Sequence, residues 1–141
     1  MKLLLATDGS EASAIAVDRL IDAIALFSKP PEITLLTVHV PVPMSFAARH
    51  IEQRALDSYY RDEGRVTLAR AASRLRASNI AFEEQVLVGQ PAEAIVSYAA
   101  DGRFDWIWIG ARGHGFVERV LLGSVAARVV QLANCPVMVA R

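Results

Sequence analysis

Cysteine is nearly absent from the sequence, with Cys135 as its single example among 141 residues. One cysteine excludes an intrachain disulfide framework and is typical of a protein in a reducing compartment. We expect Cys135 to be a small buried apolar group, because nothing nearby in the sequence would stabilise a thiolate. No apolar stretch approaches a membrane span, and the opening run that ends at Asp8-Gly9 is too short for a signal-peptide core. These absences predict a cytoplasmic protein with no membrane partner.

Lysine is also scarce, since only Lys2 and Lys29 accompany the arginines. A phosphate-binding loop in this chain therefore cannot use a lysine. Neither sign of charge predominates, because 15 basic residues balance 15 acidic ones. Such a chain has no overall field that would attract nucleic acid or an anionic membrane, but a local anion site remains compatible with it.

The remaining composition is that of a well-packed globule, with 53% hydrophobic and 21% charged residues. The length fits one domain, which we expect to span residues 1–141. Short β-rich runs alternate with longer helical patterns, which indicates an α/β fold with one parallel sheet and crossover helices. The expected strands are 3–6, 33–40, 82–88, 104–109 and 137–140.

Helical periodicity appears in the segments between these strands. The first pattern has an apolar face that reaches Phe27, and Pro30-Pro31 stops it. The second is long and charged, and Gly64 either divides it or only weakens it. We expect Ser10 to cap the first helix, with Glu11 in its first turn. The expected helices begin at Ser10, at about Phe46 (running to Arg76), at Gly89-Gln90-Pro91 and at about Ser124.

Glycines gather after the fourth expected strand, in Gly110-Ala111-Arg112-Gly113, and Gly123-Ser124 follows after nine more residues. Glycine lets the main chain turn sharply and lets N–H groups approach a phosphate with no Cβ in the way. Gly123-Ser124 opens a helix, whose free N–H groups suit an anion. The Ser124 hydroxyl either caps that helix or adds a donor to a phosphate. Ligands of open α/β sheets bind beyond the carboxyl ends of the strands, where Thr7-Asp8-Gly9 also lies.

Two common phosphate-binding motifs are excluded by the spacing. A P-loop needs Gly-Lys-Ser/Thr, which the chain lacks. Gly110, Gly113 and Gly115 read G-x-x-G-x-G after the fourth strand, whereas the dinucleotide fingerprint reads G-x-G-x-x-G after the first.

The full spacing G-x2-G-x9-G-S resembles that of the universal stress proteins, specifically their ATP-binding subclass. Ile107-Trp108-Ile109 before it and Cys135-Pro136-Val137 after it are similar to the family, as are the opening residues 3–10 and the stretch 88–91. The resemblance covers the whole chain and is weak only between about Met44 and Ile80. It implies an open five-stranded parallel sheet in the order 3-2-1-4-5, with helices on both faces. This Rossmann-like, adenine nucleotide alpha hydrolase-like fold would bring Asp8 beside Gly110.

The resemblance also implies a binding site for ATP. Asp8, next to Thr7, would approach the ribose or adenine, and Val40 would offer main-chain hydrogen bonds to adenine. Arg112 and Arg119 could add positive charge near the phosphates. We expect Mg²⁺ or Mn²⁺ to bridge phosphate oxygens with few protein ligands. The residues that would line the ribose and phosphates are Ile109, Gly110, Gly113, Gly123, Ser124 and Val125.

Histidine and tryptophan are expected to be structural here. His39 and His114 fall near the proposed site, but strand and loop histidines are more often structural than catalytic, and His50 is expected on a solvated helix. Trp106 and Trp108 alternate onto one strand face, which favours core packing over base stacking.

Three functions remain open at this point. The first is a nucleotide-binding stress or signalling protein whose output is a change of state. The second is a slow ATPase or phosphotransferase, which is weaker because no Asp, Glu or His is placed by the sequence to activate a nucleophile. The third is a dimeric stress protein that binds no nucleotide, against which the intact glycine spacing argues.

A homodimer is predicted through the final strand, Val137 to Arg141. This strand lies at a sheet edge in the order 3-2-1-4-5, and it carries no internal charge or proline to discourage pairing with another chain. Two copies would pair their last strands antiparallel about a two-fold axis, as the universal stress proteins it resembles commonly do. Light scattering coupled to size exclusion should give a dimer mass, and Val139→Lys should shift it toward monomer.

Overall fold

The computed structural model describes residues 1–41, 53–113 and 122–141. The expected start of the second helix at Phe46 lies outside the described residues. So do His50, His114, Gly115 and Arg119.

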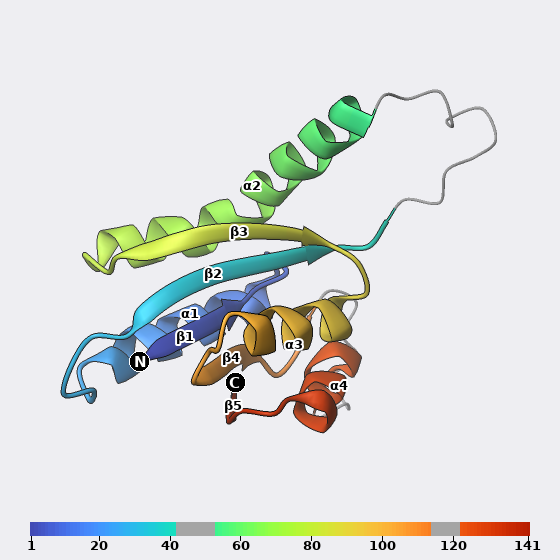
Figure 1. The fold of residues 1–141 in the computed structure, drawn as a ribbon. Coiled ribbons are helices and arrows are strands. Elements are labelled where there is room, and N and C mark those ends of the chain that lie inside the picture. Colours follow the sequence, from blue (N-terminus) through green and yellow to red (C-terminus); the bar gives the residue numbers. More distant parts are fainter. Residues whose placement is uncertain (42–52, 114–121) are drawn as a thin grey trace.

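Five parallel strands form one sheet in the order β3-β2-β1-β4-β5, which confirms the predicted fold (Figure 1). The strands are β1 Lys2–Ala6, β2 Glu32–His39, β3 Phe82–Val88, β4 Trp106–Gly110 and β5 Val137–Ala140. The helices are α1 Glu11–Ile24, α2 Gln53–Ala77, α3 Pro91–Asp101 and α4 Ser124–Leu132. None of these helices is long and apolar enough to cross a membrane.

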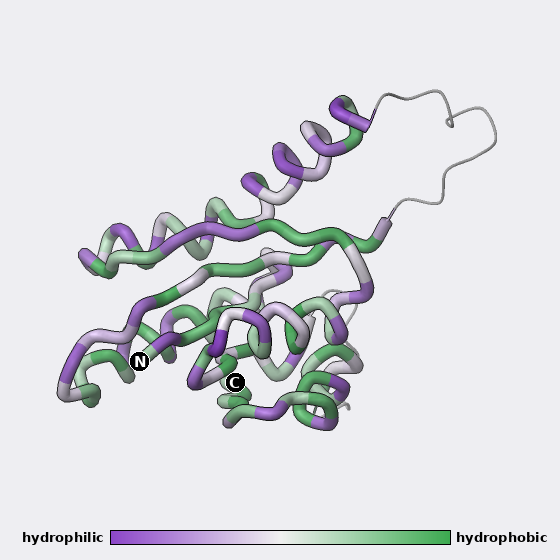
Figure 2. The backbone as a smooth tube through the Cα atoms, in the orientation of Figure 1, coloured by the Kyte–Doolittle hydropathy of each residue, from purple (hydrophilic) through white to green (hydrophobic). Residues whose placement is uncertain are grey.

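Helices cover both faces of the sheet, because alternate residues of each strand point to opposite sides. Leu3 and Leu5 of β1 pack with α1 and α2, while Leu4 packs with α3 and α4. All three leucines are fully buried, as expected for a central parallel strand. The edge of the sheet differs from this buried centre: Figure 2 shows hydrophilic residues along α2 and part of β3 at one edge.

Both tryptophans of β4 belong to the core on the α1 and α2 side, as predicted. The Trp108 indole N–H donates to the main-chain oxygen of Ala16 at 2.9 Å. This bond satisfies the one polar group of a buried ring and fixes α1 against β4.

Several expected element ends were wrong. α1 ends at Ile24 and does not include Phe27, because the N–H groups of Leu26 and Phe27 bond to carbonyls only three residues back. β4 starts at Trp106, since the Phe104 N–H donates to Ala99 and closes the turn after α3. The Ser10 cap is confirmed, because its side chain accepts from the Ser13 N–H at 3.1 Å.

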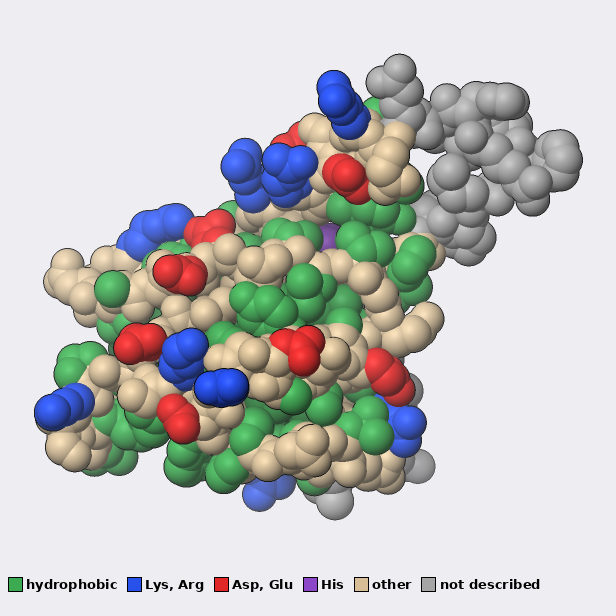
Figure 3. All heavy atoms as spheres, in the orientation of Figure 1, with side chains coloured by type: hydrophobic (Ala, Val, Ile, Leu, Met, Phe, Trp, Pro, Cys, Tyr) green, Lys and Arg blue, Asp and Glu red, His purple; other side chains and the backbone are tan. Residues whose placement is uncertain are grey.

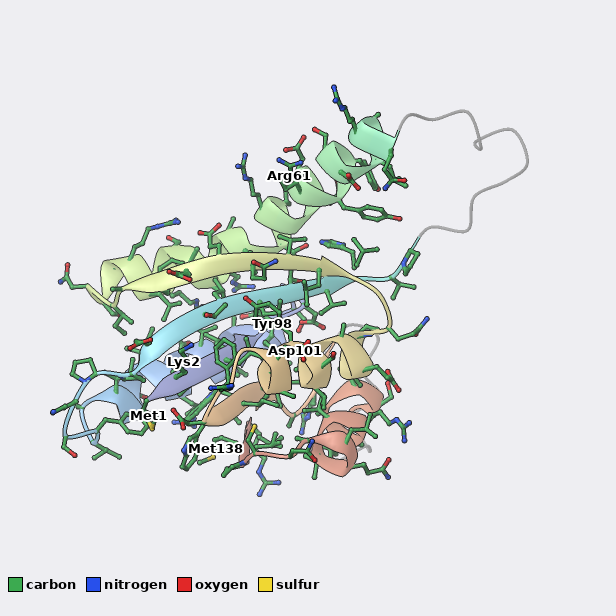
Figure 4. The ribbon with its side chains drawn as sticks, in the orientation of Figure 1. Met1, Lys2, Arg61, Tyr98, Asp101 and Met138 are labelled. Atoms are coloured by element: carbon green, nitrogen blue, oxygen red, sulfur yellow. The ribbon has the colours of Figure 1, made fainter. Side chains whose placement is uncertain are left out.

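Gly64 does not divide α2, which runs unbroken from Gln53 to Ala77. Its role is close packing, because a Cβ at this position would lie 2.4 Å from Cγ2 of Val86 in β3. The glycine therefore lets the helix approach the sheet edge. Nearer its start, α2 projects beyond the sheet, and Arg61 lies on this projecting part (Figures 1 and 4).

Gly64→Ala should lower the free energy of unfolding by about 1–3 kcal/mol, which is typical of overpacking. Helix propensity alone predicts the opposite sign, a gain of about 1 kcal/mol. Urea denaturation measures the difference. Gly89→Ala is the matched control, because a Cβ there meets only ordinary contact at 3.7 Å. A stabilised Gly64→Ala protein would show that α2 does not pack closely on β3.

Candidate functional site

A cavity of about 450 Å³ lies at the carboxyl end of the sheet, where the strand order reverses between β1 and β4. After β1 the chain continues to α1 on one face of the sheet, and after β4 it continues to α4 on the other face. The two connections therefore leave the neighbouring strands β1 and β4 in opposite directions. Residues from β1, β2, β4 and the first turns of α1, α3 and α4 line the space. Its volume is within the range of small-molecule sites, roughly 300–1,000 Å³.

The cavity collects nine of the ten residues that the sequence pointed to as a binding site. It also contains residues that sequence reasoning missed, most of them apolar. A wall of apolar side chains carries no signal that separates it from ordinary core, although Ala6 and Pro91 lie in the motif stretches 3–10 and 88–91. The nine are Thr7, Asp8, Ile109, Gly110, Arg112, Gly113, Gly123, Ser124 and Val125; the others are Ala6, Ser13, Leu36, Val38, Pro91, Ile95 and Ala126.

Val40 is the predicted residue that the structure leaves out of the cavity. It follows the end of β2, is 55% exposed and does not line the space, whereas Val38 does. The Thr7 N–H donates to the Leu36 oxygen at 2.9 Å, so main-chain groups of Leu36 face β1. Those of Val38, two residues on, face the same side. Because β1 has ended at Ala6, this side of Val38 borders the cavity with no strand beside it.

The turn after β1 holds Asp8 at the cavity. Gly9 has φ +78°, a conformation that residues with a Cβ rarely adopt. A Cβ there would also lie 3.1 Å from the Thr67 main-chain oxygen, so the turn abuts α2. The carboxylate of Asp8 accepts from the Ser10 N–H at 3.0 Å through Oδ1. The other oxygen, Oδ2, faces the glycine loop.

The glycine loop approaches this turn closely. A Cβ at Gly113 would lie 2.6 Å from Asp8 Oδ2, so a larger residue would displace the carboxylate. The loop is held from behind, because the Ala111 N–H donates to Ala140 and the Gly123 N–H donates to Ala111, both at 2.7 Å. Glycine at 113 thus keeps the two loops adjacent.

The start of α4 supplies main-chain donors beside the loop. Ser124 is the first helical residue, so the expectation that its hydroxyl caps the helix was wrong. The N-cap is Gly123, in an extended conformation and with no side-chain capping bond. Nothing in this cap competes for the first N–H groups of the helix, which together with the positive end of the helix dipole suit an anion.

Charge at the cavity is local and mixed. Arg112 is the cation and Asp8 the carboxylate among the described residues that line it. Within residues 1–41, 53–113 and 122–141, no group of three or more His, Cys, Asp or Glu could hold a metal ion. Acidic and basic side chains are interspersed over the face shown in Figure 3.

Two other titratable residues lie away from the cavity. The half-buried His39 is the last residue of β2, and its ring centroid lies 6.4 Å from that of Tyr60 in α2. Cys135 packs beside the core on the α3 and α4 side. Partial burial raises the pKa of its thiol, as expected for an apolar group and not for a nucleophile.

Known proteins resemble the chain over its full length. A family model described as the Universal stress protein family matches residues 1–141. A universal stress protein of Methanocaldococcus jannaschii is 29% identical over 142 residues, which covers 99% of this chain and 81% of that relative. The structure of the hypothetical protein MJ0577 superposes with a TM-score of 0.77 at 28% identity, covering 99% of this chain and 94% of that one. A universal stress protein solved in complex with cAMP gives 0.71 at 27% identity, covering 100% and 97%.

Proposed function

The chain belongs to the universal stress protein family, and from that premise we propose that it binds an adenine nucleotide, ATP, in the cavity between β1 and β4. The convergence of nine sequence-predicted residues on one cavity carries the proposal. The related structure solved with cAMP supports adenine nucleotides as the ligand class. The output is a stress-response or signalling change of state in the cytoplasm, with at most slow hydrolysis.

The phosphates would lie at the glycine loop and the start of α4. Main-chain N–H groups of Gly113, Ser124 and Val125 are the donors available there, and Arg112 adds positive charge. No lysine is needed for such a site. Magnesium or manganese would bind through the phosphate oxygens, since the described part of the chain offers no cluster of metal ligands.

The adenine would lie against the apolar wall that Leu36, Val38 and Ile95 provide. The main-chain N–H and C=O of Val38 face the end of the cavity beyond Ala6 and offer one donor and one acceptor. Adenine carries the matching pair, an acceptor at N1 and a donor at the 6-amino group. We therefore assign to Val38 the role that the resemblance gave to Val40.

Slow turnover is proposed because the donor set stabilises bound phosphates without an evident general base. The Asp8 carboxylate, the one that lines the cavity within the described residues, already accepts from Ser10 and lies against Gly113. Mass spectrometry of co-purified nucleotide, followed by incubation with ATP and Mg²⁺, tests the function. Retained, unhydrolysed ATP supports it; rapid ADP release favours an ATPase; and no nucleotide binding favours the non-binding branch of the family.

Gly113→Val should abolish ATP binding while the protein stays folded. The valine side chain would push the Asp8 carboxylate from its place and cover the N–H groups of the loop.

Asp8→Ala should weaken ATP binding by roughly 1–3 kcal/mol, as expected for a charged acceptor. Calorimetry measures both affinities, with Val66→Lys, at an exposed position of α2 that does not line the cavity, as a folded control. An unchanged affinity in Gly113→Val would rule out the glycine loop as the phosphate site.

Magnesium should tighten ATP binding and should not bind without nucleotide, because the ion would be held mainly by phosphate oxygens and water. Calorimetric titration of ATP with Mg²⁺ present and with EDTA present measures the change in ATP affinity. Titration of Mg²⁺ into the nucleotide-free protein measures whether the ion binds alone. Metal binding to the protein alone would contradict this arrangement.

The homodimer through β5 remains our proposal, and the structure sharpens its test. β5 is an edge strand, and its residue Met138 is an exposed apolar side chain. Figure 4 shows Met138 at this edge of the sheet. Val139 instead packs against the core, so Val139→Lys would disturb folding as well as association.

Met138→Lys should therefore shift the mass toward monomer without loss of fold, because the residue is 38% exposed and its charge would be buried at a dimer interface. Light scattering after size exclusion gives the mass, and circular dichroism reports the fold. Val66→Lys, at a 73% exposed position of α2 far from β5, is the control. A wild type that is monomeric at micromolar concentration would refute the interface.

A further inference from the structure

Two hydroxyl groups meet where β1 passes into α1, on Thr7 and Ser13. The Thr7 and Ser13 oxygens lie 2.9 Å apart, and Ser13 Oγ lies 2.9 Å from the Ser10 main-chain oxygen. Thr7 is 8% exposed and Ser13 4%, yet both line the cavity. Polar side chains this deeply buried must satisfy their hydrogen bonds among themselves or with a ligand.

Chemistry fixes the direction of each hydrogen bond in this cluster. A main-chain oxygen can only accept, so the Ser13 proton goes to Ser10. Ser13 has one proton, so the bond between the two hydroxyls must use the proton of Thr7. Thr7 Oγ1 in turn accepts from the Gly9 N–H at 3.2 Å. Both hydroxyl protons are therefore committed within the protein.

A hydroxyl oxygen has two lone pairs, and each of these oxygens uses one as an acceptor. Thr7 and Ser13 can therefore offer only an acceptor to a ligand. The neighbouring Asp8 carboxylate is also an acceptor. This corner of the cavity suits a ligand hydroxyl and disfavours a phosphate, whereas the start of α4 has the opposite preference.

The corner lies between the two ends assigned above. Thr7 directly follows Ala6, which lines the cavity. A Cβ at Gly110 would be 3.3 Å from Ser13 Cα, so Ser13 adjoins the glycine loop. In a nucleotide, the ribose lies between the base and the phosphates. The hydroxyls of the ribose are the donors that an acceptor-only corner requires.

We propose that Thr7 and Ser13 accept a hydrogen bond from a ribose hydroxyl and make the cavity selective for ribonucleotides over deoxynucleotides. The inference rests on the proposed nucleotide function and adds to it a sugar specificity and a role for Ser13. Without that hydroxyl, the pair of buried oxygens would lose its one donor from the ligand beside a bound sugar, which costs affinity.

Calorimetry with ATP, 2′-deoxy-ATP and 3′-deoxy-ATP tests the proposal on the wild-type protein. ATP should bind more tightly than at least one deoxy analogue, by roughly three- to tenfold, as for the loss of one neutral hydrogen bond. Thr7→Val and Ser13→Ala should each reduce this ratio toward one, while Thr7→Ser, which keeps the hydroxyl, should preserve it. Thr37→Val is the matched control, because Thr37 is 2% exposed and does not line the cavity.

Three outcomes would overturn the inference, and they are distinguishable. If ATP and both deoxy analogues bind equally well, the hydroxyl corner does not contact the sugar, although the nucleotide site stands. If none of the three binds to folded protein, the proposed function itself fails. Circular dichroism confirms the fold of each variant, and a ratio that is preserved in both Thr7→Val and Ser13→Ala would also exclude the two hydroxyls.

Discussion

The reversal of strand order at β1 is the constraint on which the rest of the structure depends. β1 is hydrogen-bonded to β2 on one side and β4 on the other, and its leucines are buried on both faces. The chain then departs to one face after β1 and to the opposite face after β4, and among the described residues a cavity lies at the ends of these two strands. The cavity is thus a product of topology, and its lining residues are whatever the sequence places at those ends.

Within that space, the lining groups differ in polarity. Apolar side chains of β2 and α3 line it together with the start of α4, where main-chain donors lie, and with acceptors of the β1 turn. A molecule with a flat apolar ring, a hydroxylated centre and an anionic tail matches these groups. Glycines at 110 and 113 make the arrangement possible, since side chains there would meet α1 or Asp8.

Much of this could be predicted from the sequence. The alternation of strands and helices fixed the fold class, and the glycine spacing with Asp8 pointed to nine residues of the cavity. The geometry at the ends of the elements could not be predicted in the same way. β1 ends opposite Leu36, so Val38 lines the cavity and Val40 does not, and α1 ends at Ile24 through hydrogen bonds of its own last turn. The role of Gly64 followed only from its contact with Val86.

The contact between Gly9 and Thr67 means that the turn carrying Asp8 is built by two distant segments of the chain. Ion pairs from Arg70 to Glu11 and from Arg74 to Asp18 also join α2 to α1, the helix that follows this turn. Such exposed pairs contribute little stability. In recombination between relatives, the first strand and its turn would therefore have to be inherited together with α2, because a foreign helix would press on position 9 from outside. The boundaries at which this domain can be exchanged are set by that contact and not by the glycine motif.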